Sequence, residues 1–392
     1  MRHNLKKAGL KLGTLILAAM LVTLLVAGMT LAANPPLLPF DRTDCLFVLD
    51  SSSDNASANV LRVTPSGTVT IAVTRAEIEA VAGGSGGNYF GDNGIAFDAA
   101  GTMYFVASVT NNSSIFKRKP GGSLTMLASE SALESDVGGS VDADGLAFGS
   151  DGLLYVSDDD GDRVLLVNPD NGDATEYVAE AAFNALAVIN STDIEAGIVG
   201  GGGGKIYVVS EGSPDAVFAI ASGGTPSVLA SGKPPFNDLD VFMTRAPNGD
   251  LIVADNSGAD VIHRVTPAGV VTTFLSEAEL EAVTGGDVDL EGGIAFDSYG
   301  NFYVAESKSD SILKFDKTLN GSVWVSDEDI KAVTGVKPGL DGGIAFALVP
   351  SPVGGEAYPV DRTTLLAPWI TVGLVVVSGT SWYLLRRRRA QS

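Results

Sequence analysis

A four-residue phrase, glycine–isoleucine (or leucine)–alanine–phenylalanine, recurs along this 392-residue chain and constrains its fold more than any other feature. The clear copies are residues 94–97, 145–148, 293–296 and 343–346, and the weaker copies are residues 185–188 and 240–243. Measured at the second residue, successive copies are 51, 40, 55, 53 and 50 residues apart. Units of this length usually bury their apolar faces only by packing against neighbouring units. The chain is therefore expected to fold as an array of similar units.

Within each unit, short apolar runs alternate with turn residues. A turn follows the phrase and leads into a second run, as in Ser150-Asp151-Gly152 before residues 153–156 and Pro247-Asn248-Gly249 before residues 251–253. Asp-Gly and Asn-Gly pairs between apolar runs are strong signals for a β-hairpin. A third run follows, and a fourth comes after a Pro or Gly turn, as in residues 270–275. Four antiparallel strands in each unit predict the blades of an all-β propeller.

The two ends of the array are incomplete in complementary ways. The first unit, which begins near Cys45, has three strands and lacks the inner one. The last phrase, residues 343–346, is an inner strand with no strand after it. Joining the two completes one blade and removes exposed sheet edges. Residues 45–346 are therefore expected to form a six-bladed β-propeller, closed by its N- and C-terminal strands.

The stretch from Gly293-Ile294-Ala295-Phe296-Asp297 to Gly300-Asn301-Phe302-Tyr303-Val304-Ala305 resembles the NHL repeat. The whole repeat pattern, over roughly residues 45–346, is similar to six-bladed propellers of the regucalcin/gluconolactonase and streptogramin-lyase families. This resemblance is specific for the fold and weak for activity, because propellers carry unrelated functions.

Oxygen-bearing side chains precede the inner strands, where the chain enters one mouth of the central channel. They are Asn93, Asp144, Asn184, Asp240, Glu291 and Asp341, the last two being one step out of register. Ca²⁺ takes six to eight oxygen ligands, so these residues form a candidate divalent-cation site. The resemblance implies a metal held by such residues, with Asp144 the best match and Asn93 and Asn184 next. The alternative is that Asp and Asn before glycine cap turns.

Other chemistry-bearing patterns favour structural roles. Residues 158–162 look like a calcium loop but lack the bidentate glutamate of an EF-hand, and similar loops recur at residues 211–215, 255–260 and 306–310. His263, mid-strand, is the only histidine after the predicted signal. Short helices are predicted at residues 74–81, 129–137, 276–283 and 326–333, each begun by Ser or Thr and ended by glycine.

The two ends of the chain predict export and anchoring. Residues 1–33 have the basic start, apolar run and small residues of a signal peptide. Residues 347–362 are a predicted linker, residues 363–385 a transmembrane helix, and residues 386–392, which include four arginines, a cytoplasmic basic tail. The expected location is the cell membrane, with a single crossing and the propeller on the extracytoplasmic side. Cleavage of either end stays open.

The charge of the chain limits its partners. Arg2, Lys6, Lys7, Lys11 and Arg386–Arg389 lie at the ends, so the middle carries 25 − 8 = 17 basic and 47 acidic residues, a net charge of −30. Such a surface repels phosphate backbones, which argues against nucleic acid as a partner. The leading hypothesis is a cell-surface module that binds an extracytoplasmic ligand or protein. The alternatives are a metal-dependent, lactonase-like hydrolase at the channel mouth and a purely structural envelope component.

Overall fold

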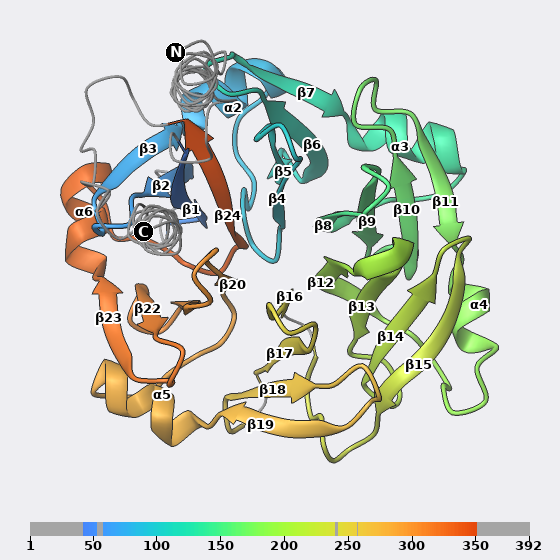
Figure 1. Cartoon of the computed structure of the whole chain (residues 1–392). Coiled ribbons are helices and arrows are strands. Elements are labelled where there is room, and N and C mark those ends of the chain that lie inside the picture. The colour runs from blue at the N-terminus through green and yellow to red at the C-terminus, as the bar shows by residue number, and fades with distance from the viewer. Residues whose placement is uncertain (1–41, 53–57, 240–241, 257, 351–392) are drawn as a thin grey trace, which may run out of the picture. The chain divides into compact units, whose positions relative to one another are not determined.

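The computed structural model describes residues 42–52, 58–239, 242–256 and 258–350. In these ranges the chain forms six four-stranded antiparallel sheets around a central axis, with one edge strand of each sheet innermost (Figure 1). The predicted signal peptide, transmembrane helix and basic tail lie outside the described residues, as does the predicted linker beyond Pro350. Within the described ranges, no helix combines the length and apolar character needed to cross a bilayer.

We number the sheets as blades 1 to 6 along the chain. Blade 1 contains β24 (Ile344–Pro350), β1 (Arg42–Asp50), β2 (Asn59–Val63) and β3 (Val69–Val73). Blade 2 contains β4 (Ile95–Phe97), β5 (Met103–Val109), β6 (Asn112–Arg118) and β7 (Leu124–Ala128). Blade 3 contains β8 (Ala143–Phe148), β9 (Leu154–Asp158), β10 (Arg163–Val167) and β11 (Ala174–Val178).

The second half of the ring repeats the same order. Blade 4 contains β12 (Ile194–Gly200), β13 (Ile206–Ser210), β14 (Ala216–Ala221) and β15 (Thr225–Ser231), with a 3₁₀ turn, η2 (Gly202–Gly204), after β12. Blade 5 contains β16 (Met243–Arg245), β17 (Leu251–Asp255), β18 (Val261–Val265) and β19 (Val271–Leu275). Blade 6 contains β20 (Ile294–Phe296), β21 (Phe302–Glu306), β22 (Ser311–Phe315) and β23 (Gly321–Val325).

The predicted closure of the ring is confirmed. The C-terminal strand β24 pairs with β1 in antiparallel register, with Leu46 opposite Phe346 and Val48 opposite Ile344. The pairing continues to Arg42 opposite Pro350, so both strands extend past the predicted limits of 45 and 346. The predicted linker therefore begins inside β24, because the ladder with β1 keeps residues 347–350 in the sheet.

The two weaker copies of the phrase were aligned incorrectly. The inner strand of blade 4 is β12, in which Ile198 pairs with Val208 as Leu146 pairs with Val156 in blade 3. Residues 185–188 instead follow a short helix, α4 (Glu180–Asn184), that buries Phe183. In blade 5 the residue at this register is Met243, two positions later than predicted. The error arose because Phe242 stands where the clear copies have glycine.

Short helices connect the outer strand of one blade to the inner strand of the next. The four predicted helices are present as α2 (Arg75–Ala82), α3 (Glu130–Val137), α5 (Glu277–Thr284) and α6 (Asp327–Thr334). Each ends at a left-handed glycine, and α2, α5 and α6 begin with a complete capping box. In α3 only the Ser129 side chain caps the helix, because Ala132 occupies the position that needs an acid. Helix α4 was not predicted, since Ala179 provides no side-chain cap.

Apolar side chains on the two faces of each sheet form the core between neighbouring blades. In one such layer Tyr104 and Val106 of blade 2 share a cluster with Leu154 and Val156 of blade 3. Strand residues alternate between the two faces of a sheet, so each blade contributes to the layer before it and the layer after it. This arrangement directs the inner strands toward a common axis and places the candidate site there.

Candidate functional site

The inner strands approach one another backbone to backbone at the axis. The Gly94 N–H donates to the Asp144 carbonyl (2.8 Å), and the Gly343 N–H donates to the Asn93 carbonyl (2.9 Å). A Cβ atom added at Gly145 would lie 2.0 Å from the Ala196 carbonyl oxygen. The glycine of the repeated phrase is therefore required by close approach of neighbouring blades.

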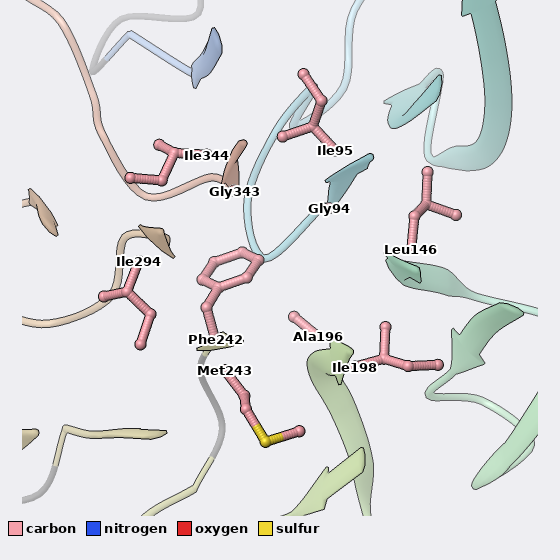
Figure 2. A pocket seen from close by; sticks show the side chains of 10 residues that line it. All are labelled: Gly94, Ile95, Leu146, Ala196, Ile198, Phe242, Met243, Ile294, Gly343 and Ile344. Atoms are coloured by element: carbon pink, nitrogen blue, oxygen red, sulfur yellow. The ribbon is translucent and has the colours of Figure 1, made fainter. Parts of the chain in front are cut away.

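The residue after this glycine lines the channel. Figure 2 shows these side chains around a small pocket of about 50 Å³, together with Phe242. We call this set the apolar floor: Ile95, Leu146, Ile198, Phe242, Met243, Ile294 and Ile344. The floor narrows the channel with aliphatic and aromatic groups and offers no charged side chain.

Phe242 is the member of the floor that breaks the repeat. It occupies the register held by glycine in the other copies, and its ring extends toward β24. A Cβ atom added at Gly343 would lie 3.2 Å from the Phe242 Cε1 atom. The ring therefore reaches from blade 5 to the closing strand and blocks much of the axis (Figure 2).

Acidic side chains lie where the chain leads into the inner strands, on one side of the apolar floor. We call them the acidic rim: Asp92, Asp144, Glu195, Glu291 and Asp341. Burial raises the pKa of Asp92, and the Asp341 carboxylate raises it further. Burial likewise raises the pKa of Glu291, with Asp289, Asp341 and Asp92 adding to the shift. The rim is therefore a concentration of negative charge at one mouth of the channel.

Asp144 lies deepest in this group. Burial raises its pKa well above the usual value for an aspartate, and Asp142, Asp159, Glu195 and Asp92 raise it further. The neighbouring charges with the largest effect on this pKa are all acidic. Among the described residues, no hydrogen bond or ion pair engages the Asp144 carboxyl group, and its raised pKa favours the protonated form.

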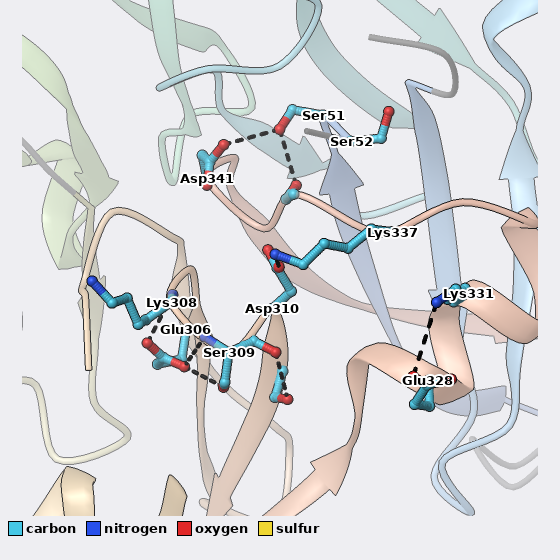
Figure 3. A network of polar contacts seen from close by, with 12 residues as sticks. Ser51, Ser52, Glu306, Lys308, Ser309, Asp310, Glu328, Lys331, Lys337 and Asp341 are labelled. Atoms are coloured by element: carbon cyan, nitrogen blue, oxygen red, sulfur yellow. Dashed lines mark hydrogen bonds and ion pairs between the residues drawn. The ribbon is translucent and has the colours of Figure 1, made fainter. Parts of the chain in front are cut away.

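The structure places the predicted site residues in different environments, and only some of them lie in the acidic rim. Asn93 is 3% exposed, and its amide donates to the Ala143 carbonyl (3.4 Å), a contact between blades. Asn184 ends α4 and donates to Glu180, so it is not next to an inner strand as predicted. Glu291 and Asp341 belong to the rim with Asp144, and Asp341 accepts from Ser51 Oγ (3.0 Å, Figure 3). Asp240 lies outside the described residues.

The prediction missed Asp92 and Glu195. Asp92 precedes Asn93 and stands two residues before the glycine of its phrase. Asp341 stands two residues before the glycine of the last copy, so this position could have been identified from the sequence. Glu195 is not among the predicted residues because the repeat pattern places the inner strand at residues 185–188, whereas the inner strand of blade 4 is β12. A register based on the paired strand, with Ile198 opposite Val208, reveals it.

Three carboxylates between blades 3 and 4 could hold a cation. Ligand oxygens of Asp159, Asp193 and Glu195 all lie within 4.8 Å of one another. Burial raises the pKa of Asp159 to about 6, and Asp193 and Asp142 contribute to this shift. Carboxylate oxygens are the ligands that hard cations such as Ca²⁺ prefer, so the three residues fit such an ion.

Other acids of the hairpin loops have the structural roles that the sequence indicated. Asp158 is fully buried and accepts from Arg163 Nε (2.5 Å), and Glu306 accepts from the Asp289 N–H (2.9 Å). Asp255 lies 3.2 Å from Nε2 of the buried His263. Figure 3 shows the corresponding region of blades 6 and 1, where Asp310 pairs with Lys337 (2.6 Å). These side chains hold the loops that lead into the inner strands.

Taken with the closed ring of four-stranded sheets, this geometry defines a six-bladed β-propeller with an acidic mouth over an apolar channel floor. The predicted fold, a six-bladed β-propeller, is confirmed. No family model and no curated protein sequence matches the chain.

Similar solved structures include a chain of a nidogen/laminin complex, with 16% identity and a TM-score of 0.52, covering 78% of this chain and 98% of that one. A protein of unknown function from Bacteroides caccae is also similar, with 16% identity and a TM-score of 0.50, covering 78% of this chain and 98% of that one. A putative gluconolactonase has 12% identity and a TM-score of 0.46, covering 71% of this chain and 91% of that one. At these identities the likeness extends to the fold alone.

Proposed function

We propose that this protein is a binding module displayed at the outer surface of the cell membrane, whose acidic rim binds a positively charged ligand or protein segment. The observation that carries the proposal is a set of mouth carboxylates whose pKa values are raised by burial and by one another. A cationic ligand would relieve this repulsion, and the field of the rim would attract it from solution.

The chemistry of the mouth also favours binding over hydrolysis. The described residues of the rim and floor include no histidine or cysteine. His263 is 7% exposed and packs against Phe236, and Cys45 is buried in β1. Neither side chain belongs to the rim or the floor. Location at the cell surface is inferred from the composition of residues 1–33 and 363–385.

Calorimetry of the full chain with hexalysine and hexaglutamate tests the binding proposal. We expect hexalysine to bind, more weakly at high salt, and hexaglutamate not to bind. The double variant Asp92→Asn/Glu291→Gln should weaken hexalysine binding about threefold to tenfold, since an exposed charge pair contributes about 0.2–1 kcal/mol. The matched control is Asp170→Asn/Glu176→Gln, which removes two exposed carboxylates of the turn before β11 and of β11 itself. Equal loss in both variants, or equal binding of both peptides, contradicts the proposal.

A metal-dependent hydrolase is the second candidate, favoured by the oxygens of Asp159, Asp193 and Glu195. When bound, a divalent ion would polarise a substrate carbonyl or activate water. In this chain the three carboxylates would hold the ion, and Asp144, whose pKa Asp159 and Glu195 help to raise, would be the nearby group able to accept a proton.

Titration of the full chain with Ca²⁺, Zn²⁺ and Mn²⁺ tests this candidate. We expect Asp159→Asn to weaken Ca²⁺ binding at least about tenfold, while the neighbouring Asp160→Asn, outside the three, leaves it within about twofold. Because protons compete for a carboxylate whose pKa is about 6, binding should weaken as the pH falls from 7 to 5. Absence of metal binding excludes the hydrolase. Turnover of a simple lactone that is lost in Asp144→Ala would favour it over the binding module.

A further inference from the structure

The channel pocket is polar although its side chains are not. The residues that line it are glycine, alanine, isoleucine, leucine, methionine and phenylalanine, whose side chains contain no oxygen or nitrogen (Figure 2). The surface exposed inside the pocket is nevertheless mainly polar. Its polar atoms therefore belong to the backbone N–H and C=O groups of the inner strands, which are strong donors and acceptors.

Hydrogen bonding within each blade fixes the direction of these groups. An inner strand lies at the edge of its sheet and pairs with the second strand on one side only. In an antiparallel pair, residues whose N–H and C=O face the partner strand alternate with residues whose groups face away from it. The Gly94 carbonyl accepts from the Val106 N–H (3.1 Å), so Gly94 faces the second strand of blade 2. The next residue, Ile95, therefore directs both its N–H and its C=O to the axis.

The other five blades have the same arrangement. The carbonyls of Phe242, Gly293 and Gly343 accept from the second strands of blades 5, 6 and 1. In blades 3 and 4 the N–H groups of Gly149 and Gly201 donate to the second strand, so the residue three positions earlier faces the axis. We call the six carbonyl oxygens that face the axis the carbonyl ring: those of Ile95, Leu146, Ile198, Met243, Ile294 and Ile344.

The chemistry of the carbonyl ring suits a monovalent cation. Rings of backbone carbonyl oxygens replace the hydration shell of K⁺ in selectivity filters. The residues of the acidic rim precede or begin the inner strands, so a cation at the ring is attracted by the rim, whereas an anion is repelled. Ca²⁺ sites usually include carboxylate ligands, and no residue that lines this pocket carries one.

We infer that the carbonyl ring is a binding site for a partly dehydrated monovalent cation of the size of K⁺. The inference goes beyond the proposed function, because binding of a ligand at the acidic rim requires no ion on the axis. An ion at the ring contacts the backbones of all six blades, so its binding stabilises the closed propeller.

Thermal unfolding of the full chain in different chloride salts tests this site. The salts are KCl, RbCl and tetramethylammonium chloride at equal concentration, with a chelator present to remove divalent ions. We expect a transition temperature about 2–4 °C higher in KCl and RbCl, because tetramethylammonium cannot be coordinated by carbonyl oxygens. General screening of the acidic surface depends on ionic strength and predicts the same temperature in all three salts. Equal transition temperatures therefore overturn the inference.

The variant Phe242→Leu separates the carbonyl ring from the aromatic side chain beside it. The variant keeps all six carbonyl groups, so the difference between KCl and tetramethylammonium chloride should remain. Loss of this difference would assign the ion to the face of the Phe242 ring and would overturn the carbonyl site.

Anomalous scattering from crystals of the full chain grown with RbCl locates the ion. A rubidium peak in contact with the carbonyl ring supports the inference, whereas a pocket that holds only water, or a peak at the rim carboxylates alone, overturns it. The two proposals fail separately. Rim-dependent hexalysine binding without a K⁺ effect removes only the carbonyl site, and the reverse result removes only the role of the rim.

Discussion

Deletion of residues 343–350 is expected to abolish folding of the propeller. These residues include β24, the inner strand of blade 1, which pairs with β1 from Arg42 to Val48. Without β24, β1 becomes an exposed inner edge, and the buried Ile344 and Ala347 no longer fill the core. The cooperative thermal unfolding transition should disappear, and the protein should aggregate, as measured by calorimetry and size-exclusion chromatography.

A rearranged chain provides the control for this deletion. Because Pro350 lies opposite Arg42, residues 343–350 moved in front of residue 42 and joined by a short turn could form a hairpin with β1 in the native register. This chain should regain a cooperative transition. If the deleted chain instead stays monomeric and unfolds cooperatively, closure by β24 is not what holds the ring together.

Substitution of Gly145 by valine is expected to lower the free energy of unfolding by at least about 3 kcal/mol. A Cβ atom at this position would lie 2.0 Å from the Ala196 carbonyl oxygen and 2.7 Å from both Ile198 Cγ2 and Ser157 Oγ. The nearest of these atoms is backbone of the neighbouring inner strand, which cannot move without disturbing the axis. Chemical denaturation monitored by circular dichroism measures the effect.

Gly286→Ala is the matched control for this substitution. A Cβ atom there would have no neighbour within 4 Å, and its backbone conformation suits any residue. We expect the free energy of unfolding to change by less than about 0.5 kcal/mol. A loss at Gly286 as large as that at Gly145 would show that crowding at the axis does not explain the effect, because loss of glycine flexibility in the unfolded chain acts in the opposite, stabilising direction.

The sequence was sufficient to predict the fold in the blades whose repeat contains the characteristic glycine, turn residues and apolar runs. The glycine of the phrase, the turn after it and the apolar runs recur because every blade packs against its neighbours in the same way around one axis. The closing strand was predictable for the same reason, since residues 343–346 carry the inner-strand phrase with no blade after them. Helix α4 was not predictable, because Ala179 lacks the capping side chain that marks the other helices.

The candidate site was predicted only in part. Asp144 was identified because it directly precedes a clear copy of the phrase, and Glu291 and Asp341 because they stand one residue further from clear copies. Asn184 was selected from a copy that proved to be a helix and turn. Replacement of glycine by Phe242 concealed the register of blade 5. Burial and hydrogen bonding separate Asn93, whose side chain joins two blades, from Asp144, whose carboxyl group has no hydrogen bond or ion pair among the described residues.

Sequence periodicity alone determined the number of blades, the order of strands and the way the ring closes, because these follow from local patterns repeated along the chain. Only the tertiary structure decided which acids meet at the mouth and what lies beneath them. The approach of Asp92, Asp144 and Glu195 depends on three different blades, and the position of the Phe242 ring depends on the space left by glycines of other strands. Such contacts join residues far apart in the chain, so no local pattern encodes them.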